Sequence, residues 1–249
     1  MTRYFLDTNC LIGLTFSTDV WNPDSRRLFD TDNTLYTSDN VVEEFCDADI
    51  KTQSEEREWD GDGGVFNRIR SRFRMGQLVF DQELQLIPDE ELNSSRIADE
   101  FIQEFEIQDE AKRRIRRYFD RNLSDPDNVE AEEARQVANN LLNYILEHSE
   151  KELSRIQHRV KLGPSREGRH QEIGQRLQSV ADNIHDEDVD VVLDAYHLLQ
   201  RDILSKLVTA DKRHVYGSRN LIQNIMGIRV LFLRDMFANS ETAGDAGMS

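Results

Sequence analysis

The chain has 249 residues, with 31 Lys and Arg against 48 Asp and Glu, and a formal net charge of −17. This length suits one sizeable domain or two small ones. The sequence shows no secretory signal pattern and no apolar run near the roughly 18 residues of a membrane helix, which predicts a cytoplasmic protein without a membrane span. The two cysteines, Cys10 and Cys46, make neither a disulfide framework nor a zinc motif.

The basic residues are mostly arginine, since lysine supplies only six of the 31. Abundant carboxylates with few lysines are typical of proteins from salt-saturated cytoplasms. There the repulsion between carboxylates is screened within about 3 Å at molar salt. We therefore expect a halophilic, archaeal type of protein, in which a negative net charge does not exclude an RNA partner.

The first predicted element is a buried strand, "YFL", which stops at Asp7. Apolar residues resume in "CLIGL", the start of a predicted helix. Asp is a favoured N-cap, because its oxygens accept from the backbone N–H groups of the first turn. The carboxyl end of a parallel strand is also where α/β folds bind their ligands. This stretch alone leaves both roles open for Asp7.

A second strand and helix follow in the same order. "TLYTS" (34–38) is a β-prone run, and "DNVVEEF" continues as a helix capped by Ser38 or Asp39. Glu43 and Glu44 lie in the first turns of this helix. Consecutive helical residues point about 100° apart, so only one of the two carboxylates can face a site.

The stretch 51–185 predicts helices and acidic turns, with "GQLVF" and "LQLIP" as the β-like runs. An amphipathic pattern that starts near Pro126 predicts one long helix or two, and "LGPSREG" ends it. Arginines cluster in "FNRIRSRFRM" and "AKRRIRRYFDR". They either pair with the abundant carboxylates or form a surface that binds RNA phosphates. The candidate RNA-binding residues are Arg70, Arg74, Arg113, Arg114, Arg116 and Arg117.

The end of the chain returns to alternating helices and strands. "VDVVLDAYHLLQRDIL" predicts an amphipathic helix that contains Asp190 and Asp194, and "KLVTAD" predicts a strand that ends near Asp211. "GIRVLFL" predicts one more buried strand. Strands that alternate with helices imply a parallel sheet. Residues 238–249 lack a core-forming pattern and are expected to be disordered.

Acids from separate elements thus converge on one edge of the predicted sheet. Asp7 and Asp211 follow strands, and a Glu and an Asp come from the two helices. Clustered carboxylates repel one another unless cations neutralise them, and hard oxygen ligands suit Mg²⁺ or Mn²⁺. A metal held there would activate water and stabilise charge on a phosphoryl group. His197, one turn beyond Asp194, is expected in the core or near the site, and His214 could contact a substrate.

Four stretches resemble, in order, the motifs of PIN-domain nucleases. They are "FLDTNCLIGL", "TSDNVVEEF", "DAYHLL" and "LVTAD". The resemblance favours Glu44 over Glu43 and Asp194 over Asp190, and it implies that Asn9 and Thr209 orient ligands or water. The catalytic and metal-binding acids that it implies are Asp7, Glu44, Asp194 and Asp211.

The resemblance covers residues 3–50 and 188–233 and implies a PIN-like α/β core, a parallel sheet flanked by helices. The core would be built from 1–50 and 186–237, with 51–185 as a large, mostly helical insertion. The implied activity is that of an endoribonuclease dependent on Mg²⁺ or Mn²⁺. PIN nucleases include toxins, rRNA-processing enzymes and RNA-decay enzymes, so the expected partners are RNA, a cognate antitoxin or other protein, and a second copy in a homodimer.

Two other interpretations come from different classes. The chain could be a non-catalytic module that keeps the PIN fold and binds RNA or a protein. Haloacid-dehalogenase phosphatases also begin with a strand-end Asp, but their chemistry needs a second Asp two residues later. Asn9 stands at that position, which argues against this class.

Overall fold

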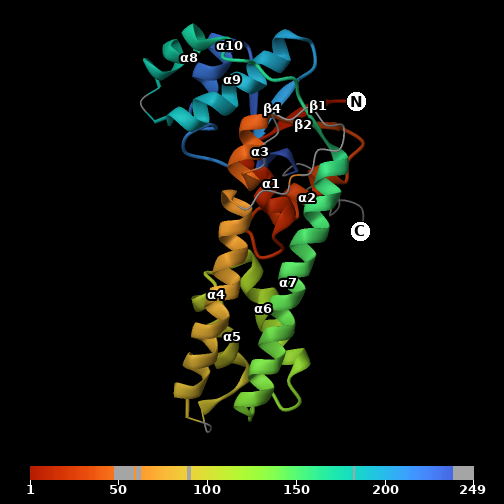
Figure 1. Cartoon of the computed structure of the whole chain (residues 1–249), viewed down its shortest axis with the longest axis vertical. Helices are drawn as coiled ribbons and strands as arrows, with labels where there is room; N and C mark the ends of the chain where they lie inside the picture. Colours follow the sequence, from red (N-terminus) through yellow and green to blue (C-terminus); the bar gives the residue numbers. More distant parts are fainter. Residues whose placement is uncertain (48–58, 60–62, 89–90, 182, 238–249) are drawn as a thin grey trace, which may run out of the picture.

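The computed structural model describes residues 1–47, 59, 63–88, 91–181 and 183–237. Within these ranges it is an α/β fold, with one parallel sheet of five strands and ten α-helices (Figure 1). The predicted fold class is therefore confirmed. The tail that was expected to be disordered, 238–249, lies outside the described residues.

The strand order of the sheet is β3-β2-β1-β4-β5, and every neighbouring pair is parallel. The chain builds β1, β2 and β3 toward one edge and then returns to add β4 on the other side of β1. The order of the strands therefore reverses between β1 and β4. The strands are β1 (Arg3–Leu6), β2 (Thr34–Thr37), β3 (Val160–Leu162), β4 (Lys206–Thr209) and β5 (Arg229–Phe232).

Helices cover both faces of the sheet, as a parallel sheet requires. In Figure 1, α8, α9 and α10 lie on one side of the strands and α1, α2 and α3 lie on the other. The first set is α8 (Gln171–Gln178), α9 (Asp186–Gln200) and α10 (Arg219–Met226). The second set is α1 (Thr8–Thr15), α2 (Asn22–Phe29) and α3 (Asp39–Cys46). A short 3₁₀ turn, η2 (Arg234–Met236), follows β5.

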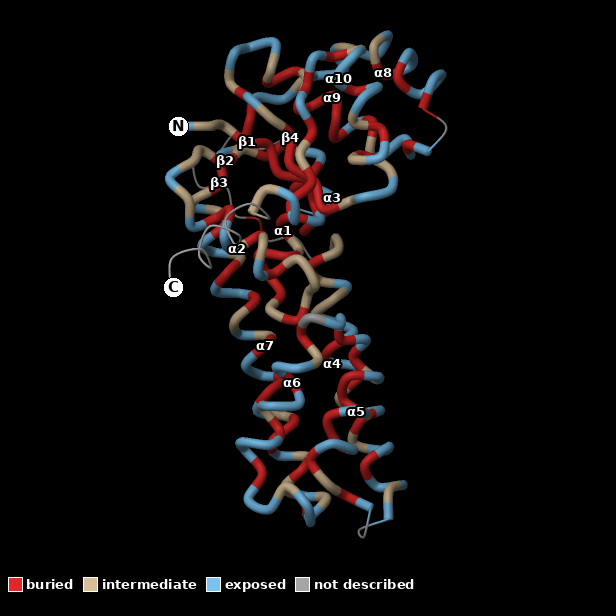
Figure 2. The backbone as a smooth tube through the Cα atoms, turned by 180° about the vertical axis from the view of Figure 1, so that it is seen from behind, coloured by how far each residue is buried: buried red, intermediate tan, exposed pale blue. Residues whose placement is uncertain are grey.

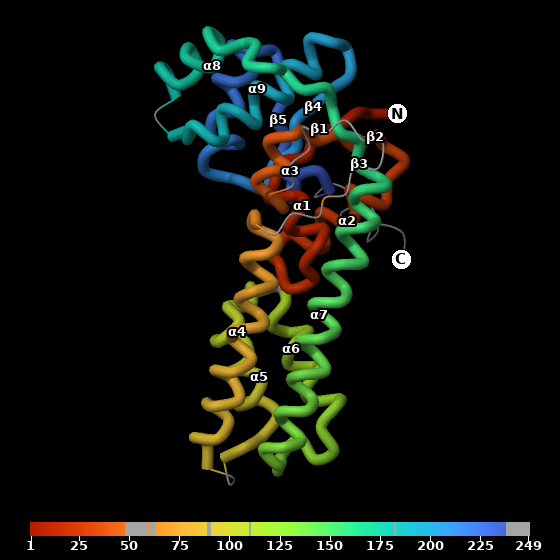
Figure 3. Tube along the Cα trace, in the orientation of Figure 1, coloured from red at the N-terminus to blue at the C-terminus, as the bar shows by residue number. Residues whose placement is uncertain are grey.

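Four helices form a stalk that projects away from the sheet (Figures 1 and 3). The stalk consists of α4 (Gly64–Leu86), α5 (Ser94–Glu104), α6 (Asp109–Asn122) and α7 (Ala131–Arg159). The helix α4 leads the chain outward from the end of α3, and α7 returns it to β3. The hydrophobic core is nevertheless one cluster, and Figure 2 shows buried segments that continue from the sheet into the stalk. The Phe66 ring, at the start of α4, lies 5.7 Å from both Phe16 and Phe45 and joins the two parts.

The middle of the chain differs from the sequence prediction at three points. The β-like runs "GQLVF" and "LQLIP" fall mainly within α4, because Gly76, Phe80 and Leu84 are buried at helical spacing. The amphipathic stretch is a single helix, α7, that begins at Ala131 rather than near Pro126. The strand β3 was missed: it pairs with β2 in the sheet, although the stretch 51–185 was predicted to be insertion alone.

The structure also addresses the predicted absence of a membrane span. Across the described part of the chain, no helix combines the length and the apolar character that crossing a membrane needs.

Candidate metal centre

Asp7 and Asp211 lie at the point where the strand order reverses. Asp7 directly follows β1, and Asp211 comes two residues after β4. The two strands are neighbours, and the backbone N–H of Asp7 donates to the Val208 carbonyl at 3.3 Å. In open parallel sheets the crevice at such a switch point is where ligands bind. The topology therefore brings the first and fourth predicted acids to this switch point, which we call the crevice.

Asp7 is both a helix cap and a member of this crevice. Its Oδ1 accepts from the backbone N–H of Cys10 at 2.9 Å, which caps α1. Its Oδ2 accepts from the Thr209 hydroxyl, and the Thr209 oxygen accepts from the backbone N–H of Asp211 at 2.9 Å. Burial raises the pKa of Asp7 from 3.8 to about 6, and the nearby charge of Asp211 adds to the rise. Thr209 thus links the Asp7 carboxylate to the backbone of Asp211 through two hydrogen bonds.

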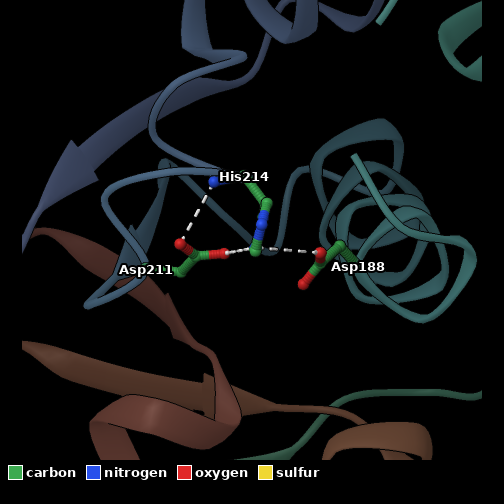
Figure 4. Close-up of side chains that lie close together, drawn as sticks. All are labelled: Asp188, Asp211 and His214. Carbon is green, nitrogen blue, oxygen red and sulfur yellow. Dashed lines mark hydrogen bonds and ion pairs between the residues drawn. The ribbon is translucent and has the colours of Figure 1, made fainter. Parts of the chain in front are cut away.

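A third acid, Asp188, meets Asp211 and His214 across the crevice (Figure 4). One ligand atom from each of the three residues lies within 4.8 Å of the others. The His214 Nδ1 is 2.9 Å from Asp211 Oδ2 and 3.9 Å from Asp188 Oδ2. Burial, followed by the charge of Asp211, raises the pKa of Asp188. Two carboxylates and an imidazole at this spacing make a donor set for a divalent cation.

Glu44 approaches the same region from α3. Its Oε2 accepts from the hydroxyl of Thr8, a buried residue in the first turn of α1. Burial raises the pKa of Glu44, and the charges of Glu187 and Asp188 raise it further. The carboxylate that the resemblance favoured therefore faces the acids of α9. The sequence analysis did not single out Thr8, although it precedes Asn9 in the first motif.

The structure does not bring Asp194 to this group. Its Oδ1 accepts from Arg166 Nε at 2.7 Å and its Oδ2 accepts from Asn40 Nδ2 at 2.8 Å, and the side chain is buried. Asp190 also pairs with Arg166. The place predicted for Asp194 beside Asp211 is taken by Asp188. The physical reason is that α9 runs back along the sheet to enter β4, so its N-terminal end lies at the crevice. Asp194 sits roughly 9 Å further along the helix.

The remaining predicted residues divide between the crevice and the core. Asn9 is exposed in the first turn of α1, while Thr209 makes the contacts described above. His197 is buried, and its Nδ1 lies 3.1 Å from the Nε2 of His170, away from the acids. Cys10 and Cys46 are free and buried.

Several of the predicted RNA-binding arginines are engaged within the protein. Arg70 pairs with Glu150 of α7 and lies over the Phe66 ring, with only 11% of its side chain exposed. It is therefore a link between helices, and its RNA-binding role stays a prediction. Arg116 pairs with Asp99 at 2.9 Å.

Arg114 likewise donates to the backbone carbonyl of Ser17. Arg74, Arg113 and Arg117 are exposed, so their RNA-binding role stays a prediction.

Comparisons with protein-family models, curated proteins and solved structures return no match for this chain.

Proposed function

We propose that this chain is a divalent-metal-dependent ribonuclease that hydrolyses RNA phosphodiester bonds in the crevice between β1 and β4. The observation that carries the proposal is the meeting of Asp188, Asp211 and His214 beside Asp7 at the switch point. The resemblance of the strand-end motifs to PIN-domain nucleases supports RNA as the substrate.

The residues present suit a divalent cation. The raised pKa values of Asp7, Glu44 and Asp188 reflect desolvation and repulsion from neighbouring carboxyls, which a cation would neutralise. Asp188, Asp211 and His214 would hold it. Of the two expected ions, Mn²⁺ fits this set better than Mg²⁺, because imidazole nitrogen is a poor ligand for Mg²⁺. When bound, such a cation supplies Lewis-acid activation of water and stabilises charge on the phosphoryl group.

The surrounding side chains position this donor set and the substrate. Thr209 fixes the carboxylate of Asp7, and Thr8 fixes that of Glu44. The positive charge of Arg68, on the first turns of α4, opposes the rise in the pKa of Glu44. Arg68 is exposed, and we propose that it binds an RNA phosphate beside the acids.

The test is cleavage of an unstructured RNA with Mn²⁺, with Asp190→Asn as the matched control for Asp188→Asn on the same helix. We expect Asp188→Asn and Asp211→Asn each to reduce cleavage by at least about 100-fold, because each removes a charged metal ligand. Asp190→Asn should keep activity close to that of the original chain. Cleavage that survives EDTA, or that persists in the two ligand variants, would contradict the proposal.

A further inference from the structure

The outer face of α4 is the most apolar part of the described surface. Eight large hydrophobic side chains stand out as exposed in the described residues, and four of them lie on this one helix. They are Met75 (72% exposed), Leu78 (69%), Val79 (42%) and Leu86 (76%). On a chain with a net charge of −17, apolar side chains gathered on one helix face indicate an interaction surface.

The charges that flank these side chains are arranged with a two-fold pattern. Arg72 and Glu83 lie at equal distances from the middle of α4, between Gln77 and Leu78, and so do Arg74 and Asp81. At about 100° per residue, the first pair falls on one side of the apolar face and the second pair on the other. A second α4 laid antiparallel across this face would therefore meet opposite charges on both sides.

We propose that two copies of this chain associate through the outer faces of their α4 helices, packed antiparallel about an axis between Gln77 and Leu78. Arg72 of each copy then lies beside Glu83 of the other, and Arg74 beside Asp81. The apolar Met75, Leu78 and Val79 fill the centre of the interface. The proposal does not depend on the ribonuclease activity.

The shape of the surface accommodates this packing. A groove of about 560 Å³ runs between α4 and the end of α5. It is lined by Gly63, Asn67, Arg68, Ser71, Arg72, Met75, Gly76, Val79 and Glu104. In the antiparallel register, Leu86 of the second copy comes to the level of Ile69, between the groove residues Arg68 and Ser71.

Arg72 and Asp81 already make ion pairs within the chain, and these pairs do not prevent contacts with a second copy. Arg72 pairs with Glu106, and 46% and 69% of the two side chains are exposed. Asp81 lies 3.7 Å from Arg135. The exposed Arg72–Glu106 pair contributes little, so trading it for Glu83 of a second copy costs little. Only 25% and 26% of the Arg135 and Asp81 side chains are exposed, so Asp81 keeps this partner and Arg74 of the second copy is added beside it.

Sedimentation of the 249-residue chain over a range of concentrations tests the proposal. We expect a dimer, and we expect Leu78→Glu with Val79→Glu to weaken it by at least about tenfold, because two charges enter the centre of the interface. The far-UV circular dichroism should be unchanged, since both side chains are exposed. A monomer at every concentration, or a dimer that the double variant leaves intact, would overturn the proposal.

Charge reversal tests the register itself. Arg72→Glu alone and Glu83→Arg alone should each weaken self-association roughly three- to tenfold, because like charges then face each other. A mixture of these two variants should associate as well as the original chain, since both contacts in the mixed dimer again join opposite charges. Failure of the mixture to recover would exclude this antiparallel register.

Cross-linking supplies a third, independent readout. Leu78→Cys lies next to the axis and should form an intermolecular disulfide under mild oxidation. Gln85→Cys is the control, because the two copies of that position would lie about 20 Å apart along the helices. The native cysteines are both buried and do not compete. Equal cross-linking of the two variants would contradict the proposed packing.

Discussion

Asp7 shows at the scale of one residue how a structural role and a chemical role coincide. The same carboxylate caps α1 through Cys10 and faces Asp211 through Thr209. The backbone N–H and the hydroxyl stabilise its charged form, yet burial outweighs them and the pKa rises to about 6. Keeping a carboxylate charged here at neutral pH therefore costs folding stability, which is a common feature of functional sites.

Removing this charge should stabilise the protein at neutral pH. A carboxyl whose pKa is raised in the folded state binds its proton more tightly there, so stability is lost as pH rises from about 4 to about 6. We expect Asp7→Asn to raise the free energy of unfolding by about 1–2 kcal/mol at pH 7.5 in EDTA. That is part of the roughly 3 kcal/mol that a change of about two pKa units represents.

Chemical denaturation at two pH values measures this effect. At pH 3.5 the original Asp7 is protonated in the folded state and mostly protonated in the unfolded state, so the advantage of the variant should shrink toward zero. An advantage of equal size at both pH values would show that the gain does not come from the charge.

At the scale of elements, the sequence was sufficient where an element has a strong local pattern. The strands that end at Leu6 and Thr209 were predicted from short apolar runs. The cap of α3 was predicted at Ser38 or Asp39 from the N-cap preference of these residues, and it lies at Ser38. The strand β3 was not, because Val160–Leu162 has only three residues and directly continues α7. Its identity depends on pairing with β2, which is far away in sequence.

The candidate site was predictable to the same extent. Acids directly after strands could be placed, because the end of a parallel strand fixes where the next residue points. It was harder to predict which acid of α9 reaches the site, since Asp188, Asp190 and Asp194 all fit a helix beside the sheet. Only the direction of α9 relative to β4 decides that its N-terminal acid, Asp188, reaches the crevice.

Asp194 instead makes a buried ion pair that ties α9 to the segment after β3. Only 12% of the Arg166 side chain and 7% of the Asp194 side chain are exposed. We expect Arg166→Met to lower the free energy of unfolding by about 3 kcal/mol, because it leaves the Asp194 charge buried without its partner. The measurement is chemical denaturation at neutral pH.

Two further variants separate the ion pair from simple packing. Asp190→Asn should cost less than about 1 kcal/mol, since 54% of that side chain is exposed. Arg166→Met combined with Asp194→Leu should recover part of the loss, because no unpaired charge remains. The loss of stability in Arg166→Met and in Asp194→Leu is also measured singly. If the double variant loses as much stability as these two variants together, the unpaired charge is not the cause of the loss.

At the scale of the whole molecule, the stalk and the sheet share one hydrophobic cluster. Within the stalk, Phe101 lies 4.4 Å from Phe105 and 5.5 Å from both Phe80 and Phe119. Phe66 joins the stalk to the sheet by contacting a ring from α3 and one that follows α1. The helix α7 makes a second connection, because it packs against α1 and its Glu152 pairs with Arg26 of α2. The helix α3 also carries Glu44, so the joint and the crevice share an element.

This arrangement predicts that the Phe66 joint contributes to the cooperative unfolding of the two parts. Far-UV circular dichroism reports mainly the stalk, whose α4 and α7 alone have 23 and 29 residues. In a Trp59→Phe background, fluorescence of the remaining Trp21 reports the sheet, because that ring packs 5.3 Å from Phe232 of β5. With Phe66 present, the two signals should give coincident denaturation curves. Phe66→Ala should cost about 3–5 kcal/mol and separate them.

Phe101→Ala is the matched control, because it removes an equally buried ring from inside the stalk. It should cost a similar 3–5 kcal/mol, yet the two curves should still coincide, since the joint is intact and the loss is shared by one cooperative unit. If the two curves also separate in Phe101→Ala, any weakening of the stalk is enough to uncouple its unfolding from that of the sheet. Separate curves already with Phe66 present would show that the sheet and the stalk fold independently, and the continuous cluster would then carry no cooperativity between them.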